Sequence, residues 1–242
     1  MMSCMISFYL TWIALVFAAG GLQGGDPDAL YRQREQPQSA AAAEQIWSAR
    51  LARDPRDVES AWKLARARYW LGGHADAATR KTYLEGGIAA GRAAVAAAPD
   101  KPEGHFWIAA NMGTLAEAYG LRQGLKYRGK IKEELETVLK RDPGFMRGSA
   151  DRALGRWYNR VPGLFGGSNK KSEEHLRKSL SYDANSTVSH FFLAQTLLDE
   201  DRNAEAIEEL KKVLAAPYDA DWEPEDREYK QKASDLLSKI RR

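Results

Sequence analysis

The chain has 242 residues, of which 44% are hydrophobic and 29% charged, so a disordered or fibrous protein is excluded and one or two globular domains are expected. Its single cysteine, Cys4, excludes a disulfide framework, a thiolate zinc site and a CxxC redox pair within the chain. The net charge is +3, but residues 120–182 carry 15 basic and 7 acidic side chains, whereas residues 183–242 carry 9 and 14. This is not the even basic coat of a nucleic-acid-binding protein, so no nucleic-acid partner is expected.

The N-terminus predicts export. The first 25 residues carry no charge, and Met5–Ala19 is an apolar run that ends in small residues. A run of about 15 apolar residues has the length of a signal-peptide core and is shorter than the ~20 residues of a spanning helix. No Lys or Arg precedes the run, so an uncleaved anchor is the alternative, and Cys4 stands before it, where it is not a lipobox cysteine. We expect residues 1–20 to be a signal peptide or an anchor, the mature chain to begin near residues 19–21, and the protein to be periplasmic or otherwise exported.

The rest of the chain is predicted to be a polar tether followed by one helical domain. Residues 21–39 contain Gly, Gln and Pro between charged side chains, which is typical of a tether. From residue 40 to residue 242, apolar side chains recur at three- and four-residue spacing, and no segment alternates with period two for long. The fold class is therefore all-α, with a single domain over residues 40–242.

The predicted helices repeat. Turns centred on Pro55, Pro99, Pro143, Ala184 and Pro217 are separated by 44, 44, 41 and 33 residues. After each of the first four turns, a large apolar residue stands next to a small one, in the pairs Leu64-Ala65, Ile108-Ala109, Leu154-Gly155 and Leu193-Ala194. Only Ala or Gly leaves room where two antiparallel helices cross closely. The last step matches the 34-residue tetratricopeptide period, and the longer steps fit the same unit with enlarged turns.

We therefore predict a right-handed superhelix of about four degenerate tetratricopeptide-like helix pairs with capping helices. The first pair is predicted to turn at Gly72-Gly73, and Ser168 is predicted to be the N-cap of the second helix of the third pair. The expected helices, with the front and end caps first and last, are 45–53, 58–71, 83–98, 103–119, 125–141, 147–160, 168–181, 187–200, 204–215 and 225–240.

Residues suited to catalysis are missing from this pattern. The four histidines lie far apart in sequence without metal-ligand spacing, and there is no GxSxG elbow. The segment 166–172 (GGSNKKS) superficially looks like a phosphate loop, but no glycine directly precedes the lysine and no strand leads in, which favours a capped helix start. We predict neither enzymatic activity nor a cofactor or metal.

A groove on the inner surface is the candidate site. Tetratricopeptide positions place Arg and aromatic side chains together there, and such a surface could hold a carboxylate with an apolar tail. In the alternative interpretation, the aromatic rings fill a narrow interior and the arginines pair with acids such as Glu59 or Glu103. Arg152 and Arg156 are four residues apart, so they either anchor an anion or form salt bridges to another helix, through Glu117 or Glu103. The candidate residues are Trp62, Arg66, Trp70, Phe106, Trp107, Asn111, Arg152, Arg156 and Asn159.

Two strings carry a more specific resemblance. Residues 107–113 (WIAANMG) and 153–167 (ALGRWYNRVPGLFGG) are similar to the T-component family of TRAP-transporter-associated proteins, and the similarity runs from about residue 40 to residue 217. The resemblance implies a periplasmic helical-repeat protein that binds the solute-binding protein of a TRAP-type uptake system. It also implies a homotrimer and a small organic anion as ligand. Family members can be lipoproteins, whereas this chain has no lipobox cysteine.

Two functions follow as hypotheses. The first is an exported, non-enzymatic accessory protein of a TRAP-type uptake system that binds a solute-binding protein and a small organic anion. The second is a general tetratricopeptide scaffold of the cell envelope that holds a peptide or protein in the same groove, with no role in transport.

Overall fold

The computed structural model describes residues 25–240 and is built from helices, with no strand in this range. The apolar run at residues 5–19 and the predicted cleavage sites therefore lie outside the described residues. Within them, no helix is both long and apolar enough to span a membrane. The elements are α1 (Pro27–Arg32), α2 (Pro37–Arg53), α3 (Val58–His74), α4 (Ala77–Ala97), α5 (Pro102–Tyr119), α6 (Leu121–Arg141), α7 (Phe145–Arg160), the short 3-10 helix η1 (Gly163–Phe165), α8 (Asn169–Tyr182), α9 (Thr187–Leu198), α10 (Asn203–Ala215) and α11 (Glu223–Ile240).

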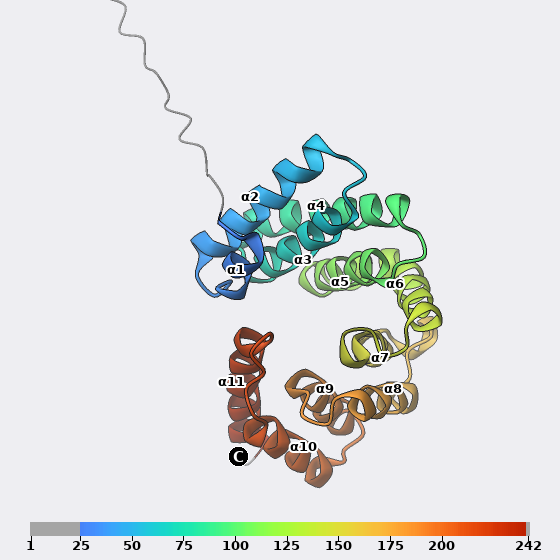
Figure 1. Ribbon diagram of the computed structural model, residues 1–242. Helices are drawn as coiled ribbons and strands as arrows, with labels where there is room; N and C mark the ends of the chain where they lie inside the picture. Colours follow the sequence, from blue (N-terminus) through green and yellow to red (C-terminus); the bar gives the residue numbers. More distant parts are fainter. Residues whose placement is uncertain (1–24, 241–242) are drawn as a thin grey trace, which may run out of the picture.

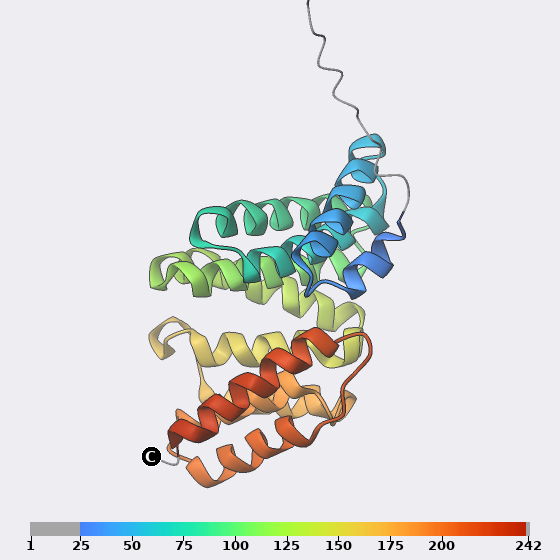
Figure 2. The same ribbon diagram turned by 90° about the vertical axis from the view of Figure 1, so that its left-hand side faces the viewer.

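The helices form a superhelix of antiparallel pairs, which confirms the predicted all-α repeat fold. The pairs are α3 with α4, α5 with α6, α7 with α8, and α9 with α10. The chain winds into an open ring whose inner side is formed mainly by the first helix of each pair (Figure 1). The last helix, α11, crosses the open side of this ring (Figure 2).

The close crossings are where the sequence predicted them. The large and small residues of the four repeated pairs are all buried, with Leu64, Ile108, Leu154 and Leu193 each at most 2% exposed. At Gly155 an added Cβ would lie 2.5 Å from Leu176 Cγ, so only glycine fits between α7 and α8. The Ser168 hydroxyl accepts a hydrogen bond from the Lys171 backbone N–H, as expected of an N-cap.

Histidine–acid bridges within the pairs are a second repeated feature. His105 of α5 contacts Glu134 of α6 at 2.5 Å, and His190 of α9 contacts Glu209 of α10 at 2.5 Å. The other ring nitrogen contacts the carbonyl oxygen six residues earlier at 3.0 Å in both cases. These histidines therefore have a structural role, because each holds an inner helix to its outer partner and to the preceding turn.

The predicted turn at Gly72-Gly73 is wrong, because both glycines lie inside α3. An added Cβ at Gly72 would lie 2.6 Å from Leu84 Cγ, so this glycine serves a close crossing with α4 instead of a turn. The chain turns at Ala75-Asp76, where the Asp76 carboxylate caps α4 by accepting a hydrogen bond from the Thr79 N–H at 2.9 Å.

The predicted tether is also folded where the structure describes it. Residues 27–32 form α1, and Tyr31 is 6% exposed because its ring packs 5.9 Å from the ring of Trp47. Arg34 is only 3% exposed. This part of the segment is polar in sequence but is held by contacts with distant residues, so its composition gave no sign of packing.

Candidate functional site

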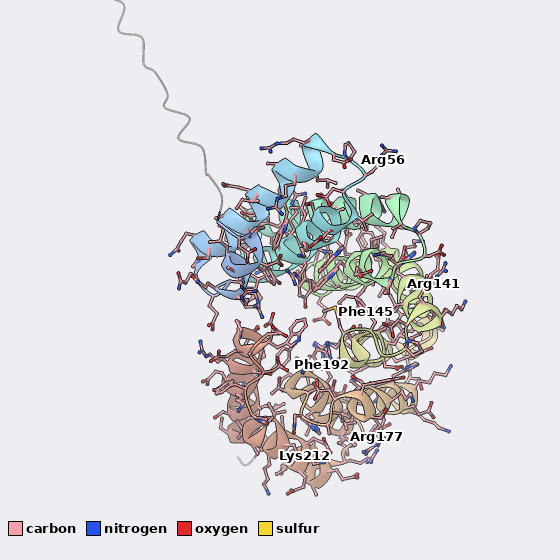
Figure 3. The ribbon with its side chains drawn as sticks, in the orientation of Figure 1. Arg56, Arg141, Phe145, Arg177, Phe192 and Lys212 are labelled. Carbon is pink, nitrogen blue, oxygen red and sulfur yellow. The ribbon has the colours of Figure 1, made fainter. Side chains whose placement is uncertain are left out.

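A cavity of about 1080 Å³ fills the centre of the ring. This volume is slightly above the range of about 300–1,000 Å³ that is typical of small-molecule sites. Figure 3 shows Phe192 on the inner side of the ring, whereas Arg56, Arg141, Arg177 and Lys212 lie on its outer side. The aromatic side chains that line the cavity are Tyr31, Tyr69, Trp70, Phe106, Trp107, Trp157, Phe191, Phe192, Tyr218, Trp222 and Tyr229.

The C-terminal helix completes the wall of this cavity. The ring of Tyr229, on α11, lies 5.4 Å from the ring of Phe191 and 5.7 Å from that of Phe192, both on α9. The ring of Tyr69, on α3, lies 5.5 Å from that of Trp107, on α5. Edge-on and tilted aromatic contacts of this kind fix the rings in place. The cavity is therefore bounded by side chains already held by one another.

A buried ion pair joins the two ends of the folded chain. The Arg34 guanidinium donates to the Glu225 carboxylate on α11 through Nε at 3.0 Å and through Nη2, and Nη2 also donates to the Asp221 carbonyl oxygen at 3.0 Å. The same guanidinium lies 5.2 Å from the ring of Trp70. The Glu225 side chain is 14% exposed, and this burial raises its pKa even beside Arg34.

The start of α7 contributes a second closing contact. Met146, Arg147 and Gly148 all have positive φ values, of 44°, 55° and 74°, so the helix begins with a left-handed segment. For Met and Arg this conformation is strained. It accompanies an ion pair from the Arg147 guanidinium to Asp219, in the connection before α11.

All of the acidic side chains that line the cavity have partners. Glu117 pairs with Arg156, and Glu225 pairs with Arg34. The others are Glu228, which pairs with His74 and Lys232; Asp183 and Asp219, which pair with Arg147; and Asp226, which accepts hydrogen bonds from the Thr187 hydroxyl and the Asp219 N–H.

Arg152 differs from these groups. It lines the cavity and is half-buried, yet its guanidinium has no hydrogen bond or ion pair to any residue in the range 25–240. Burial lowers the pKa of this guanidinium. Arg160 also lines the cavity without a partner among these residues, but it is exposed to solvent.

The two arginines that the sequence placed together both line the cavity, but they differ in their partners. The Arg156 guanidinium donates to both carboxylate oxygens of Glu117, at 2.8 and 3.2 Å, and to Gln195 Oε1 at 2.6 Å. This is one of the inter-helix salt bridges named as an alternative. Arg152 has no such acid. Trp70, Phe106, Trp107, Arg152 and Arg156 are the candidate residues that line the cavity.

The other four candidates lie elsewhere. The Arg66 guanidinium pairs with Asp28 of α1 at 3.2 Å, and it lies 5.1 Å from the ring of Trp62. The partner of Arg66 is thus neither of the acids expected from the sequence. Asn111 is fully buried, and its amide donates to the Ala65 and Trp107 carbonyl oxygens. Asn159 donates to Asp199 Oδ2 at 2.7 Å, away from the cavity.

The sequence analysis missed the contribution of α11. Tyr229 and Glu228 belong to a helix predicted only as a cap, and nothing in the spacing of its residues shows that it folds across the inner surface. The one signal is that Glu225 and Tyr229 are four residues apart, which places them on one face of the helix.

No group of three or more His, Cys, Asp or Glu side chains suited to a metal ion occurs in the part of the chain that the structure describes.

A match to a known protein family covers most of the cavity-lining helices. The family model "Regulator of microtubule dynamics protein 1-3" matches residues 26–165, which is more than half of the chain. The chain belongs to the RMD1-3 family. The matched range begins at α1 and ends at η1, so it includes Tyr69, Arg152 and Arg156 but not α11. The T-component family of TRAP-associated proteins is not shown by this match.

Solved structures share the fold of this RMD1-3 family chain. The tetratricopeptide protein TTC0263 of Thermus thermophilus has a TM-score of 0.66 at 21% identity, over 87% of this chain and 97% of that chain. A crystal structure of MamA has a TM-score of 0.50 at 15% identity, over 83% of this chain and 95% of that chain. The MamA RS-1 ArsTM double mutant has a TM-score of 0.51 at 18% identity, over 79% of this chain and 95% of that chain. These likenesses establish a tetratricopeptide-like fold. Among the curated proteins, none matches the chain.

One ion pair at the cavity predicts that the stability of the folded protein depends on pH. His74 Nε2 lies 3.7 Å from Glu228 Oε2, and the ring stacks on Trp70 with the centroids 3.9 Å apart. The contact with Glu228 raises the pKa of His74 above 6.5, and it lowers the pKa of Glu228 to about 2. The stability from a raised histidine pKa is present below pH 6.5 and is lost as the pH rises through the raised value. The stability from a lowered carboxylate pKa is present above pH 4.5 and is lost as the pH falls toward 2.

Glu228→Gln should therefore destabilise the protein more at about pH 5.5 than at about pH 8.5, because the charge on His74 is lost as the pH rises through its raised pKa while the Lys232 pair with Glu228 remains. Urea unfolding at the two pH values measures the difference, and the NMR titration of His74 should shift down toward 6.5 in the variant. An equal loss of stability at both pH values would show that the His74 contact contributes nothing.

Proposed function

We propose that this protein is a non-enzymatic binding protein whose tetratricopeptide-like scaffold holds a partner protein at the inner surface of the ring and a small organic anion in the cavity. The cavity of about 1080 Å³ carries the proposal, because it is lined by aromatic rings on six helices, α1, α3, α5, α7, α9 and α11. A concave, mostly apolar site with a few polar groups is typical of ligand binding. The fold shared with tetratricopeptide proteins supports a protein partner in general.

The finer proposal names the partner and the compartment. The uncharged N-terminus supports export, and the resemblance to the T-component family supports the solute-binding protein of a TRAP-type system as the partner. A general scaffold role in the cell envelope is the alternative. The name of the RMD1-3 family describes regulation of microtubule dynamics by proteins of that family, and it adds microtubules to the partners to be distinguished.

Site-specific photo-crosslinking in the cells of origin tests the proposal. Leu164 is 90% exposed beside the lining residues Val161 and Pro162, and Tyr218 is 54% exposed and itself lines the cavity. A photoreactive residue at either position should capture one and the same protein. Lys211, which is exposed on α10 outside the cavity, is the matched control.

The identity of the captured protein decides between the alternatives. A TRAP solute-binding protein supports the finer proposal, and a different protein captured at both positions leaves only the scaffold role. Crosslinks that form at Lys211 and at neither inner position would place the partner on the outer face and overturn the proposal.

A further inference from the structure

The cavity has an excess of positive charge at one place. Its acidic side chains are all paired, so none is left to balance Arg152. A buried or half-buried charge is normally paired, because removing it from water is costly. The guanidinium of Arg152 carries five N–H donors in a planar fork, and none of them is used within residues 25–240. A ligand with acceptor oxygens would satisfy them.

Two phenols in the same cavity add unused donors. The hydroxyls of Tyr69 and Tyr229 line the same cavity and make no hydrogen bond to any residue that the structure describes. Burial raises the pKa of Tyr69 to about 12 and also raises that of Tyr229. Both phenols therefore stay protonated at neutral pH, where they donate hydrogen bonds and cannot neutralise Arg152.

The side chains around these donors indicate the polarity and the charge of the rest of the ligand. Phe106, Phe191 and Phe192 line the cavity, and the remaining lining cations either are paired, bind a backbone carbonyl or are open to solvent. One free charge among aromatic rings suits a ligand with one anionic group and an apolar body. A small dianion such as succinate would have only one of its two charges matched.

We propose that Arg152, together with Tyr69 and Tyr229, binds the single carboxylate or phosphate group of a ligand whose apolar body lies against the phenylalanine rings. This inference rests on the proposed function, because it takes the cavity to be the ligand site. Of the two arginines, only Arg152 is assigned to the anion, because Arg156 is already bound by Glu117 and Gln195.

Two fluorescent probes with the same body test the charge. 8-Anilinonaphthalene-1-sulfonate carries one anionic group, and N-phenyl-1-naphthylamine has the same ring system without it. Arg152→Gln should weaken binding of the sulfonate by about 30-fold or more, as expected when a charged partner is lost in a desolvated site. Binding of the neutral probe should change less than about twofold.

Lys211→Gln is the control, because Lys211 is exposed on α10 and lies outside the cavity. It should leave the binding of both probes unchanged. Equal weakening by Arg152→Gln and Lys211→Gln, or no weakening by Arg152→Gln, would overturn the inference. Tyr229→Phe, which removes only one hydroxyl, should weaken the sulfonate selectively and gives a second test if Arg152→Gln does not fold.

Displacement of the sulfonate probe then identifies the anionic group. Decanoate or decyl phosphate should displace it, and whichever acts at lower concentration names the preferred group. Decanol acting as well as decanoate, or succinate acting as well as either, would contradict a site for an apolar monoanion. These results are independent of the crosslinking test, so the inference can fail while a partner protein is still captured at the inner surface.

Discussion

Arg34→Met is expected to lower the free energy of unfolding by about 3–5 kcal/mol, which is the usual cost of removing one partner of a buried ion pair. Methionine matches the apolar stem of Arg34 but leaves the Glu225 carboxylate without its counterion. The Asp221 carbonyl oxygen also loses a donor. Urea unfolding followed by circular dichroism measures the change in the free energy of unfolding.

Arg32→Met provides the control for that measurement. Arg32 is exposed, and among residues 25–240 its guanidinium pairs only with Asp26, at 3.8 Å. Exposed ion pairs contribute little, so its loss should change the free energy of unfolding by less than about 1 kcal/mol. Equal effects of the two substitutions would show that the contact between Arg34 and Glu225 does not hold α11 in place.

Gly155→Leu should cost about 1–3 kcal/mol or more, because it overpacks the crossing between α7 and α8. Even the first added carbon would lie 2.5 Å from Leu176 Cγ and 3.1 Å from the Ser172 carbonyl oxygen, and Leu176 is fully buried. The melting temperature and the free energy of unfolding should both fall. Shortening the opposing side chain in the double variant Gly155→Leu, Leu176→Ala should recover part of the loss.

Gly129→Leu separates overpacking from the other effects of replacing a glycine. Gly129 is exposed on α6, and an added Cβ there would meet no atom within 4 Å. Because leucine is the better helix former, this change should be neutral or stabilising by up to about 1 kcal/mol. A Gly155→Leu protein as stable as Gly129→Leu would mean that α7 and α8 do not cross at Gly155.

Much of the fold could be predicted from local patterns. The apolar spacing and the aspartate–proline turns place most helix ends within a few residues, because these signals depend on near neighbours in sequence. Gly72 shows where such reasoning fails: a glycine needed for contact with Leu84 looks the same in sequence as one needed for a turn. Residues 27–34 could not be predicted either, because Tyr31 and Arg34 are buried only by residues distant in sequence.

The candidate site was less predictable for the same reason. The spacing of Arg152 and Arg156 correctly places both at the inner surface, and Glu117 was among the acids considered for them. Their different surroundings depend on which inner helices face each other. Tyr229 reaches the site only because α11 folds back over α9. The periodic pattern of the sequence does not predict this packing of the last helix.

The contact between Arg34 and Glu225 changes how the protein should gain and lose its structure. An open solenoid behaves as a row of neighbours, so its end repeats can fray without disturbing the middle. Here the first and last units are joined across 191 residues of sequence, and neither end can detach without breaking a buried contact. Closing so long a loop is costly in chain entropy and raises the average sequence separation of the native contacts. The ring should therefore close late in folding and then unfold as one cooperative body.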